Sequence, residues 1–267
     1  MGIKKKFGFS ATHVDLPPTK VRFGFTLAEG ATHIILPPTK ARFGFTLAEV
    51  LITLGIIGVV AALTIPNLIA NNKARRLKSQ FMESYSIVQQ VFKQMEADDV
   101  SLDPKDYPTG QFYKTFMKYV QAPTDCNRKR MSVCYYWVAD GKDDEHSKPY
   151  KTLDGKATVA GNWFDDGQIA LQNGSLILFE NYTDIDQLWV SVDLNGYNNP
   201  PNRWGVDLFT FQFIEGELVT MGDPKSKYND IDTYCNPKVS NTFNGIACAK
   251  RAKTESDYFN WVVKNVK

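Results

Sequence analysis

Residues 43–66 read FGFTLAEVLITLGIIGVVAALTIP, an almost uninterrupted apolar stretch with one acid, Glu49, near its start. The 21 residues from Phe45 to Ile65 would span roughly 31 Å as an α-helix, which is enough to cross a bilayer. A carboxylate is costly inside hydrocarbon, so Glu49 is a candidate functional residue. The competing interpretation is an acid tolerated at the membrane interface, because helix N-termini favour negative charge.

The residues around Glu49 form a pattern with several parts. It combines a basic flank, a glycine, the run F-T-L-A-E and a proline behind the apolar stretch: Lys40, Arg42, Gly44, Phe45 to Glu49, and Pro66. This pattern resembles the processing site of type IV pilins and of the pseudopilins of type II secretion systems. The resemblance is strong over residues 42–70 and weaker along the helix as far as residue 97.

The resemblance implies how the chain is processed and assembled. In this family a membrane-embedded prepilin peptidase cleaves after the glycine, here Gly44, and methylates the new amino-terminal residue, here Phe45. Glu49 would pair with the amine of a neighbouring subunit in a filament, and Pro66 would lie in the same assembly helix. The implied partners are prepilin peptidase, other pilin or pseudopilin subunits, the inner membrane and an assembly platform.

The leader, residues 1–44, contains an internal duplication and is expected to be cleaved off. ATHVDLPPTKVRFGFTLAE (11–29) recurs as ATHIILPPTKARFGFTLAE (31–49), with three differences in 19 positions. No apolar helix follows the first copy, so a membrane-embedded peptidase would have no anchored substrate there. We interpret the first copy as a tandem duplication or as the result of a misassigned start, and we expect cleavage at the second copy.

The distribution of charge argues against a nucleic-acid partner. The leader carries seven Lys or Arg and two acids, so the chain after Gly44 has a net charge of −3. Nucleic-acid-binding domains normally carry a basic patch or stripe. We therefore predict no nucleic-acid partner.

Four cysteines follow the apolar stretch: Cys126, Cys134, Cys235 and Cys248. An even number of cysteines in a loop-rich region is typical of an oxidising compartment, and buried free thiols are the alternative. Zinc is disfavoured because the spacings contain no C-x2-C pair. Four cysteines permit three connectivities. We expect Cys126 to pair with Cys134 and Cys235 with Cys248, since each local bridge closes a short polar loop.

The cysteines also decide the predicted orientation. Basic residues flank the apolar stretch on both sides, so the positive-inside rule alone is ambiguous. An oxidising compartment for the cysteines places the head outside the cytoplasm. We predict a single-pass inner-membrane protein before assembly, and a periplasmic or cell-surface filament afterwards.

The periodicity of apolar residues changes along the chain. Beyond Pro66 they recur in steps of three and four, which marks one face of an amphipathic helix, so residues 45–97 are predicted to form a transmembrane and stalk helix. In residues 98–267, short apolar runs alternate with Gly, Asn, Asp and Pro clusters, which predicts a β-rich head domain. The predicted fold class is α+β, with one long helix packed on an antiparallel sheet, and the pilin resemblance implies the same architecture.

Six runs in the head are candidate strands: 132–140, 167–172, 175–180, 187–194, 207–214 and 217–221. Asn173-Gly174 and Glu215-Gly216 separate neighbouring runs and are predicted hairpin turns. In the segment 193–211, oxygen atoms of Asp193, Asn195 and Asp207 could contribute to a calcium site. The sequence is not an EF-hand loop, and a network of turns made by Asn and Asp side chains is the favoured interpretation. We predict no cofactor.

The sequence contains no nucleophile elbow, no metal-binding cluster and no glycine-rich phosphate loop, so we predict that the protein is not an enzyme. His146 lies in an acidic run and is interpreted as part of a solvated loop. The predicted function is a structural subunit of a type IV pilus or a type II secretion pseudopilus. The alternatives are a membrane-anchored tip or ligand-binding pilin-like protein and an anchored extracytoplasmic enzyme.

Overall fold

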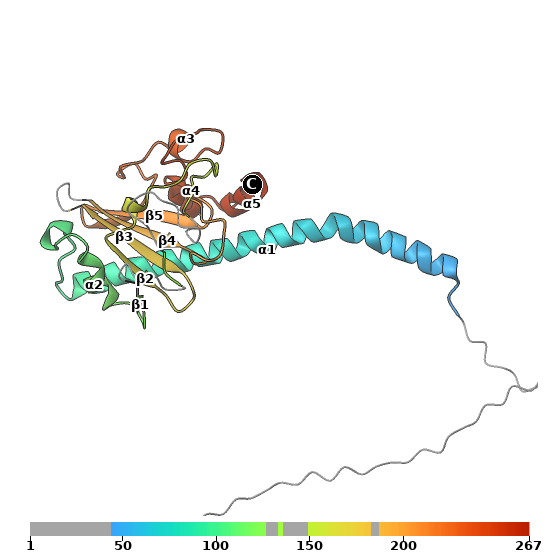
Figure 1. The fold of residues 1–267 in the computed structure, drawn as a ribbon, viewed down its shortest axis with the longest axis horizontal. Helices are drawn as coiled ribbons and strands as arrows, with labels where there is room; N and C mark the ends of the chain where they lie inside the picture. Colours follow the sequence, from blue (N-terminus) through green and yellow to red (C-terminus); the bar gives the residue numbers. More distant parts are fainter. Residues whose placement is uncertain (1–43, 127–132, 136–148, 183–186, 267) are drawn as a thin grey trace, which may run out of the picture. The chain divides into compact units, whose positions relative to one another are not determined.

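A single long helix begins the described part of the chain. The structure is a computed structural model that describes residues 44–126, 133–135, 149–182 and 187–266. Helix α1 runs from Leu47 to Ala97 without a break (Figure 1). Its second half buries one face, with residues in steps of three and four: Ala74, Leu77, Phe81, Ser84, Tyr85, Val88, Val91, Phe92 and Met95. This is the stripe expected of an amphipathic helix on a core.

The head contains a six-stranded antiparallel sheet in which spatial order follows chain order. Its strands are β1 (Thr124–Asp125), β2 (Gly167–Ala170), β3 (Leu176–Tyr182), β4 (Gln187–Asp193), β5 (Leu208–Ile214) and β6 (Glu217–Thr220). The long helix followed by this sheet confirms the predicted α+β, pilin-like architecture.

Both predicted hairpin turns are present. Asn173-Gly174 lies between β2 and β3, with Gly174 at φ +87°, and Glu215-Gly216 joins β5 to β6 as a two-residue loop. Both residues of the second turn have positive φ, at +50° and +77°, which matches the type I′ geometry that follows the twist of a hairpin. The turns set the register, so Ile214 pairs with Glu217.

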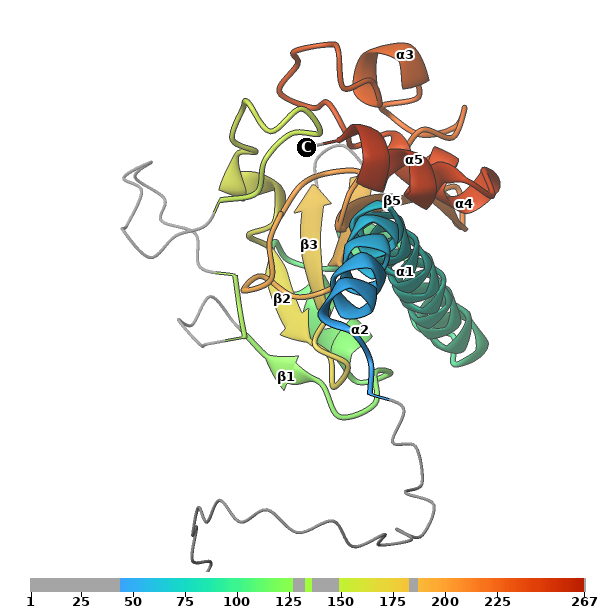
Figure 2. The same ribbon diagram turned by 90° about the vertical axis from the view of Figure 1, so that its right-hand side faces the viewer.

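The sheet separates two layers of buried side chains. Alternate residues of each strand face opposite sides, so Ile177 and Phe179 pack with the stalk half of α1. Leu176 and Leu178 instead face a second cluster with Trp189 and other aromatic residues of the connecting segments. Figure 2 looks toward the end of α1 and shows the strands beside the helix, with α4 and α5 next to it.

Short helices complete the head: η1 (Pro104–Asp106), α2 (Phe112–Met117), η2 (Gly161–Trp163), α3 (Ile231–Tyr234), α4 (Cys248–Thr254) and α5 (Tyr258–Asn265). Our sequence analysis identified none of them, because helices of three to eight residues have too few turns to show a period and are stabilised by packing. The predicted strand at 132–140 is wrong for its described part, since residues 133–135 form a turn and a bend. The rest of that run lies outside the described residues.

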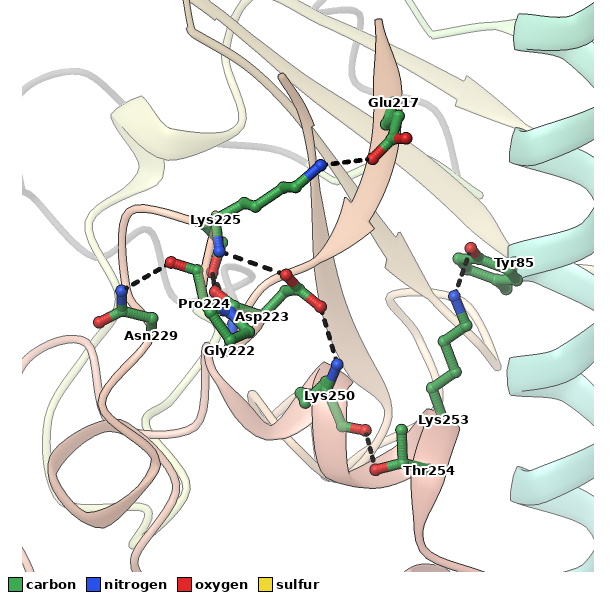
Figure 3. Close-up of polar contacts among 11 residues, drawn as sticks. Tyr85, Glu217, Gly222, Asp223, Pro224, Lys225, Asn229, Lys250, Lys253 and Thr254 are labelled. Carbon is green, nitrogen blue, oxygen red and sulfur yellow. Dashed lines mark hydrogen bonds and ion pairs between the residues drawn. The ribbon is translucent and has the colours of Figure 1, made fainter. Parts of the chain in front are cut away.

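Polar contacts anchor helix α4 to α1 and to the loop after β6 (Figure 3). Lys253 Nζ on α4 donates to Tyr85 Oη on α1 at 2.6 Å and lies 4.2 Å from the centroid of the same ring. Lys250 Nζ, one turn earlier, forms an ion pair with Asp223 Oδ2 at 2.7 Å, and this contact lowers the pKa of Asp223. Helix α4 therefore links the stalk helix to the loop after β6.

Two disulfide bonds close loops of the head. Cys126 is bonded to Cys134, and Cys235 is bonded to Cys248, the first residue of α4. Both bridges are local, with sequence separations of 8 and 13 residues. These are the two local pairs of the sequence analysis. The second bridge ties the end of α3 to the start of α4, so it holds two elements too short to be stable alone.

Candidate functional site

The start of α1 is closed by reciprocal hydrogen bonds between Thr46 and Glu49. The backbone N–H of Thr46 donates to Glu49 Oε2 at 2.8 Å, and the Thr46 hydroxyl donates to the same oxygen at 2.9 Å. The backbone N–H of Glu49 donates to Thr46 Oγ1 at 3.2 Å. This is a capping box, in which two side chains satisfy N–H groups that a helix start leaves unpaired. Our sequence analysis missed the role of Thr46, although the T-x-x-E spacing signals it.

The capping box bears on what cleavage would do. The N–H that Thr46 donates belongs to the peptide bond between Phe45 and Thr46. Cleavage after Gly44 breaks the preceding peptide bond, so it leaves the capping box intact. A new amine on Phe45 would then lie one residue before the side chain that binds Glu49. The segment therefore offers a capped helix start in both the uncleaved and the cleaved chain.

The first half of α1 exposes its apolar side chains on every side. Leu47 is 76% exposed and Leu63 70%, and no part of the most apolar stretch of α1 is buried. A helix that is apolar all round is typical of a membrane span or of a helix packed among other helices. By its length and composition α1 can cross a membrane.

Pro66 lies inside α1, four residues after Ala62, and the helix continues through it. A proline has no N–H to donate to the carbonyl of the residue four positions earlier. Two polar side chains near Pro66 donate to other carbonyls of the helix: Thr64 Oγ1 donates to Val60 O at 2.9 Å, and Asn67 Nδ2 donates to Leu63 O at 3.4 Å. Such back-bonding is common where a side chain competes with the helical ladder.

The head segment suggested for calcium is a network of turns. Asp193 and Asp207 are fully buried. Asp193 Oδ1 accepts from the backbone N–H groups of Asn195 and Gly196 at 3.2 and 2.9 Å, and its Oδ2 accepts from Tyr150 Oη at 2.8 Å. This is the arrangement in which carboxylates order loops by binding backbone donors.

Asp207 is held in the same way. Its Oδ1 and Oδ2 accept from the backbone N–H groups of Arg203 and Asn202 at 2.7 and 2.9 Å. Burial and the nearby Asp207 raise the pKa of Asp193 to about 7, and burial raises the pKa of Asp207 to about 6. The backbone donors oppose the effect of burial on both groups. A cation at this position would compete with four backbone donors of the loop and with the hydroxyl of Tyr150.

The head also has open grooves along α1. One of about 550 Å³ is lined by Glu83, Ile87 and Gln90 of the helix together with residues 119–122 and 171–173. Another of about 570 Å³ lies between residues 102–104 and the β5–β6 turn. Both grooves have mixed polar and apolar linings. They are candidate surfaces for a neighbouring chain or a ligand. The described residues that line them include no cluster of catalytic side chains.

Comparison with known families assigns the N-terminal segment. Residues 39–65 match the family described as the prokaryotic N-terminal methylation motif, which is the signature of type IV pilins and pseudopilins. The match covers Gly44, Phe45 and Glu49. No curated protein and no solved structure matches the chain. The N-terminal segment therefore carries the type IV pilin and pseudopilin signature, and the head behind it has the α+β, pilin-like architecture. The motif implies processing by prepilin peptidase and assembly with other pilin subunits.

Proposed function

We propose that the protein is a structural subunit of a type IV pilus or a type II secretion pseudopilus, without enzymatic activity. The single observation that carries the proposal is that the methylation motif and an exposed apolar helix surface cover the same residues. The methylation motif spans residues 39–65, and the side chains of α1 over this span are exposed and apolar. A soluble monomer would not keep such a surface in water. A membrane accommodates it before assembly, and neighbouring helices of a filament accommodate it afterwards.

Each end of α1 has its own task in this proposal. The chain is cleaved after Gly44, just before α1 begins. The first half of α1 then anchors the chain in the inner membrane and later packs among other subunits. The second half binds the head through its buried stripe from Ala74 to Met95. The disulfides support a head on the extracytoplasmic side, since such bonds persist in oxidising compartments.

Glu49 is proposed to pair with the methylated amine of a neighbouring subunit. The capping box holds its carboxylate at the start of the helix, next to the predicted cleavage site. Two charges that are each costly in an apolar filament core are tolerated when paired, and a pair at one position sets the register. The residue thus combines a structural role within its own helix with an assembly role between chains.

Amino-terminal mass spectrometry of the protein purified from its native membranes tests the proposed processing. We expect the chain to begin at a methylated Phe45. Gly44→Ala should accumulate uncleaved precursor, because the cleaved bond follows this glycine. Gly24→Ala changes the corresponding glycine of the first leader copy and is the matched control, which should be processed normally. A mature start at Met1 or at Phe25 would overturn the proposal.

A further inference from the structure

Three carboxylates meet where β2 begins beside β3. Asp165 and Asp166 directly precede β2, and Glu180 lies in β3. Each contributes a carboxylate oxygen, and these oxygens all lie within 4.8 Å of one another. The backbone N–H of Asp166 donates to Phe179 O at 3.2 Å, and Gly167 pairs with Phe179 in the ladder. Extending this register by one residue places Asp166 directly opposite Glu180, a position where like charges destabilise a sheet.

Glu180 points into this group from a buried position. Its side chain is only 4% exposed, and its Oε2 has no hydrogen-bond partner among the described residues. Burial, together with the charges of Asp166 and Asp165, raises the pKa of Glu180 to about 9. A buried carboxylate next to two other acids needs either a proton or a cation to be tolerated.

We propose that Asp165, Asp166 and Glu180 bind a calcium ion. Calcium prefers carboxylate and other oxygen ligands at about 2.3–2.6 Å, so two oxygens on opposite sides of one ion are about 4.8 Å apart. Magnesium, at about 2.0–2.1 Å, would require them to lie within about 4.2 Å. The three carboxylate oxygens lie within 4.8 Å of one another, a separation that the flexible coordination of calcium spans, whereas magnesium demands near-ideal octahedral geometry at shorter distances.

Solvent can supply the remaining ligands. A depression of about 300 Å³ is lined by Asp165 and Asp166 together with Thr109, Gly110 and Tyr113. It connects the half-buried Asp165 to the surface, while Asp166 and Glu180 are buried. Calcium takes six to eight oxygens, so water or backbone carbonyls would complete a set that begins with three carboxylates.

This site differs from the one that the sequence suggested. The carboxylate oxygens of Asp193 and Asp207 already accept hydrogen bonds from backbone N–H groups and from Tyr150. In contrast, Glu180 Oε2 is unsatisfied within the described part of the chain. The proposed role is to hold the start of β2 against β3, and it does not depend on cleavage or filament assembly.

Calcium titration of the full chain in detergent, after treatment with a chelator, tests the proposal. Thermal unfolding should shift upward with calcium and much less with magnesium at the same concentration. Terbium should report the site by luminescence, because Trp189 is the cross-strand neighbour of Glu180 and can transfer excitation to a bound ion. Glu180→Gln should raise the calcium concentration at half-saturation at least about tenfold, because one of three charged ligands is lost.

Two further variants keep the test decisive. Asp165→Asn changes the half-buried ligand and should weaken calcium binding in the same sense even if Glu180→Gln fails to fold. Glu217→Gln removes an exposed acid that pairs with Lys225, and it should leave the calcium response unchanged. The proposal is overturned if the wild-type chain shows no calcium-dependent shift, if magnesium acts equally, or if the response survives Glu180→Gln and is lost in Asp207→Asn.

Discussion

Phe81 offers the sharpest test of how the stalk holds the head. Its side chain is fully buried on the face of α1 that meets the sheet. Its ring centroid lies 4.8 Å from that of Phe209 and 6.0 Å from that of Phe211 on β5, and 5.8 Å from that of Phe259 on α5. Phe81 therefore joins three elements that are far apart in the sequence.

Phe81→Ala should lower the stability of the head by about 3–5 kcal/mol, because it removes a buried ring and leaves a cavity that the surrounding side chains fill only in part. For a domain of this size the loss corresponds to a decrease in melting temperature of roughly 6–20 °C. The assay is thermal unfolding of the full chain in detergent, followed by the fluorescence of the buried Trp189 and Trp204.

Met82→Ala is the matched control for this experiment. Met82 is the next residue of the same helix and is 45% exposed, so its truncation should change the stability by less than about 0.5 kcal/mol. Processing should be normal in both variants, since residue 81 lies outside the methylation motif at 39–65. Equal melting temperatures for Phe81→Ala and Met82→Ala would refute the packing of α1 on the sheet.

Three other predictions concern the helix start, the disulfides and pH. Glu49→Gln removes the charge but keeps the capping box, which accepts glutamine, so the variant should be inserted and cleaved yet fail to form filaments. Thr46→Ala removes the cap and keeps the charge, so filaments sheared from the cells should still contain this variant. Cys248→Ser should destabilise the head by about 2–4 kcal/mol. Peptide mapping of the wild-type chain without reductant should recover both local bridges. Asp193 and Asp207 have raised pKa values, so from about pH 4 to 7 the folded head binds more protons than the unfolded chain and its stability falls as pH rises. A melting temperature in calcium-free buffer that is higher at about pH 8 than at about pH 5 would contradict this sign.

The strands of the head could be predicted because their signals are local. The runs 175–180 and 187–194 are short, apolar and bounded by turn residues, and they correspond to β3 and β4. Asn173-Gly174 marks its hairpin because glycine accepts the positive φ of that turn. The strand β1 was missed, since its two residues have no pattern of their own and pair with β2 only in the folded head.

The candidate sites also divide into residues that the sequence identifies and contacts that only the structure shows. Gly44, Phe45 and Glu49 are recognisable from the sequence, because cleavage and capping depend on neighbouring residues of one segment. The carboxylates of Asp193 and Asp207 lie close enough for their charges to interact. Whether their oxygens are free to bind a cation depends on the backbone donors that the loop brings to them. Tyr150, more than 40 residues away, supplies another donor that the sequence could not indicate.

The sequence by itself determined that the chain has a long apolar helix with a processing motif, followed by a strand-rich head with four cysteines. These features follow from periodicity, composition and spacing within short windows. Only the tertiary structure decided that the apolar face of α1 packs against β5, how α4 reaches Tyr85, and that Glu180 meets Asp165 and Asp166. Those contacts join residues that are distant in the chain, and their free energy comes from burial and charge proximity, which exist only once the strands are paired.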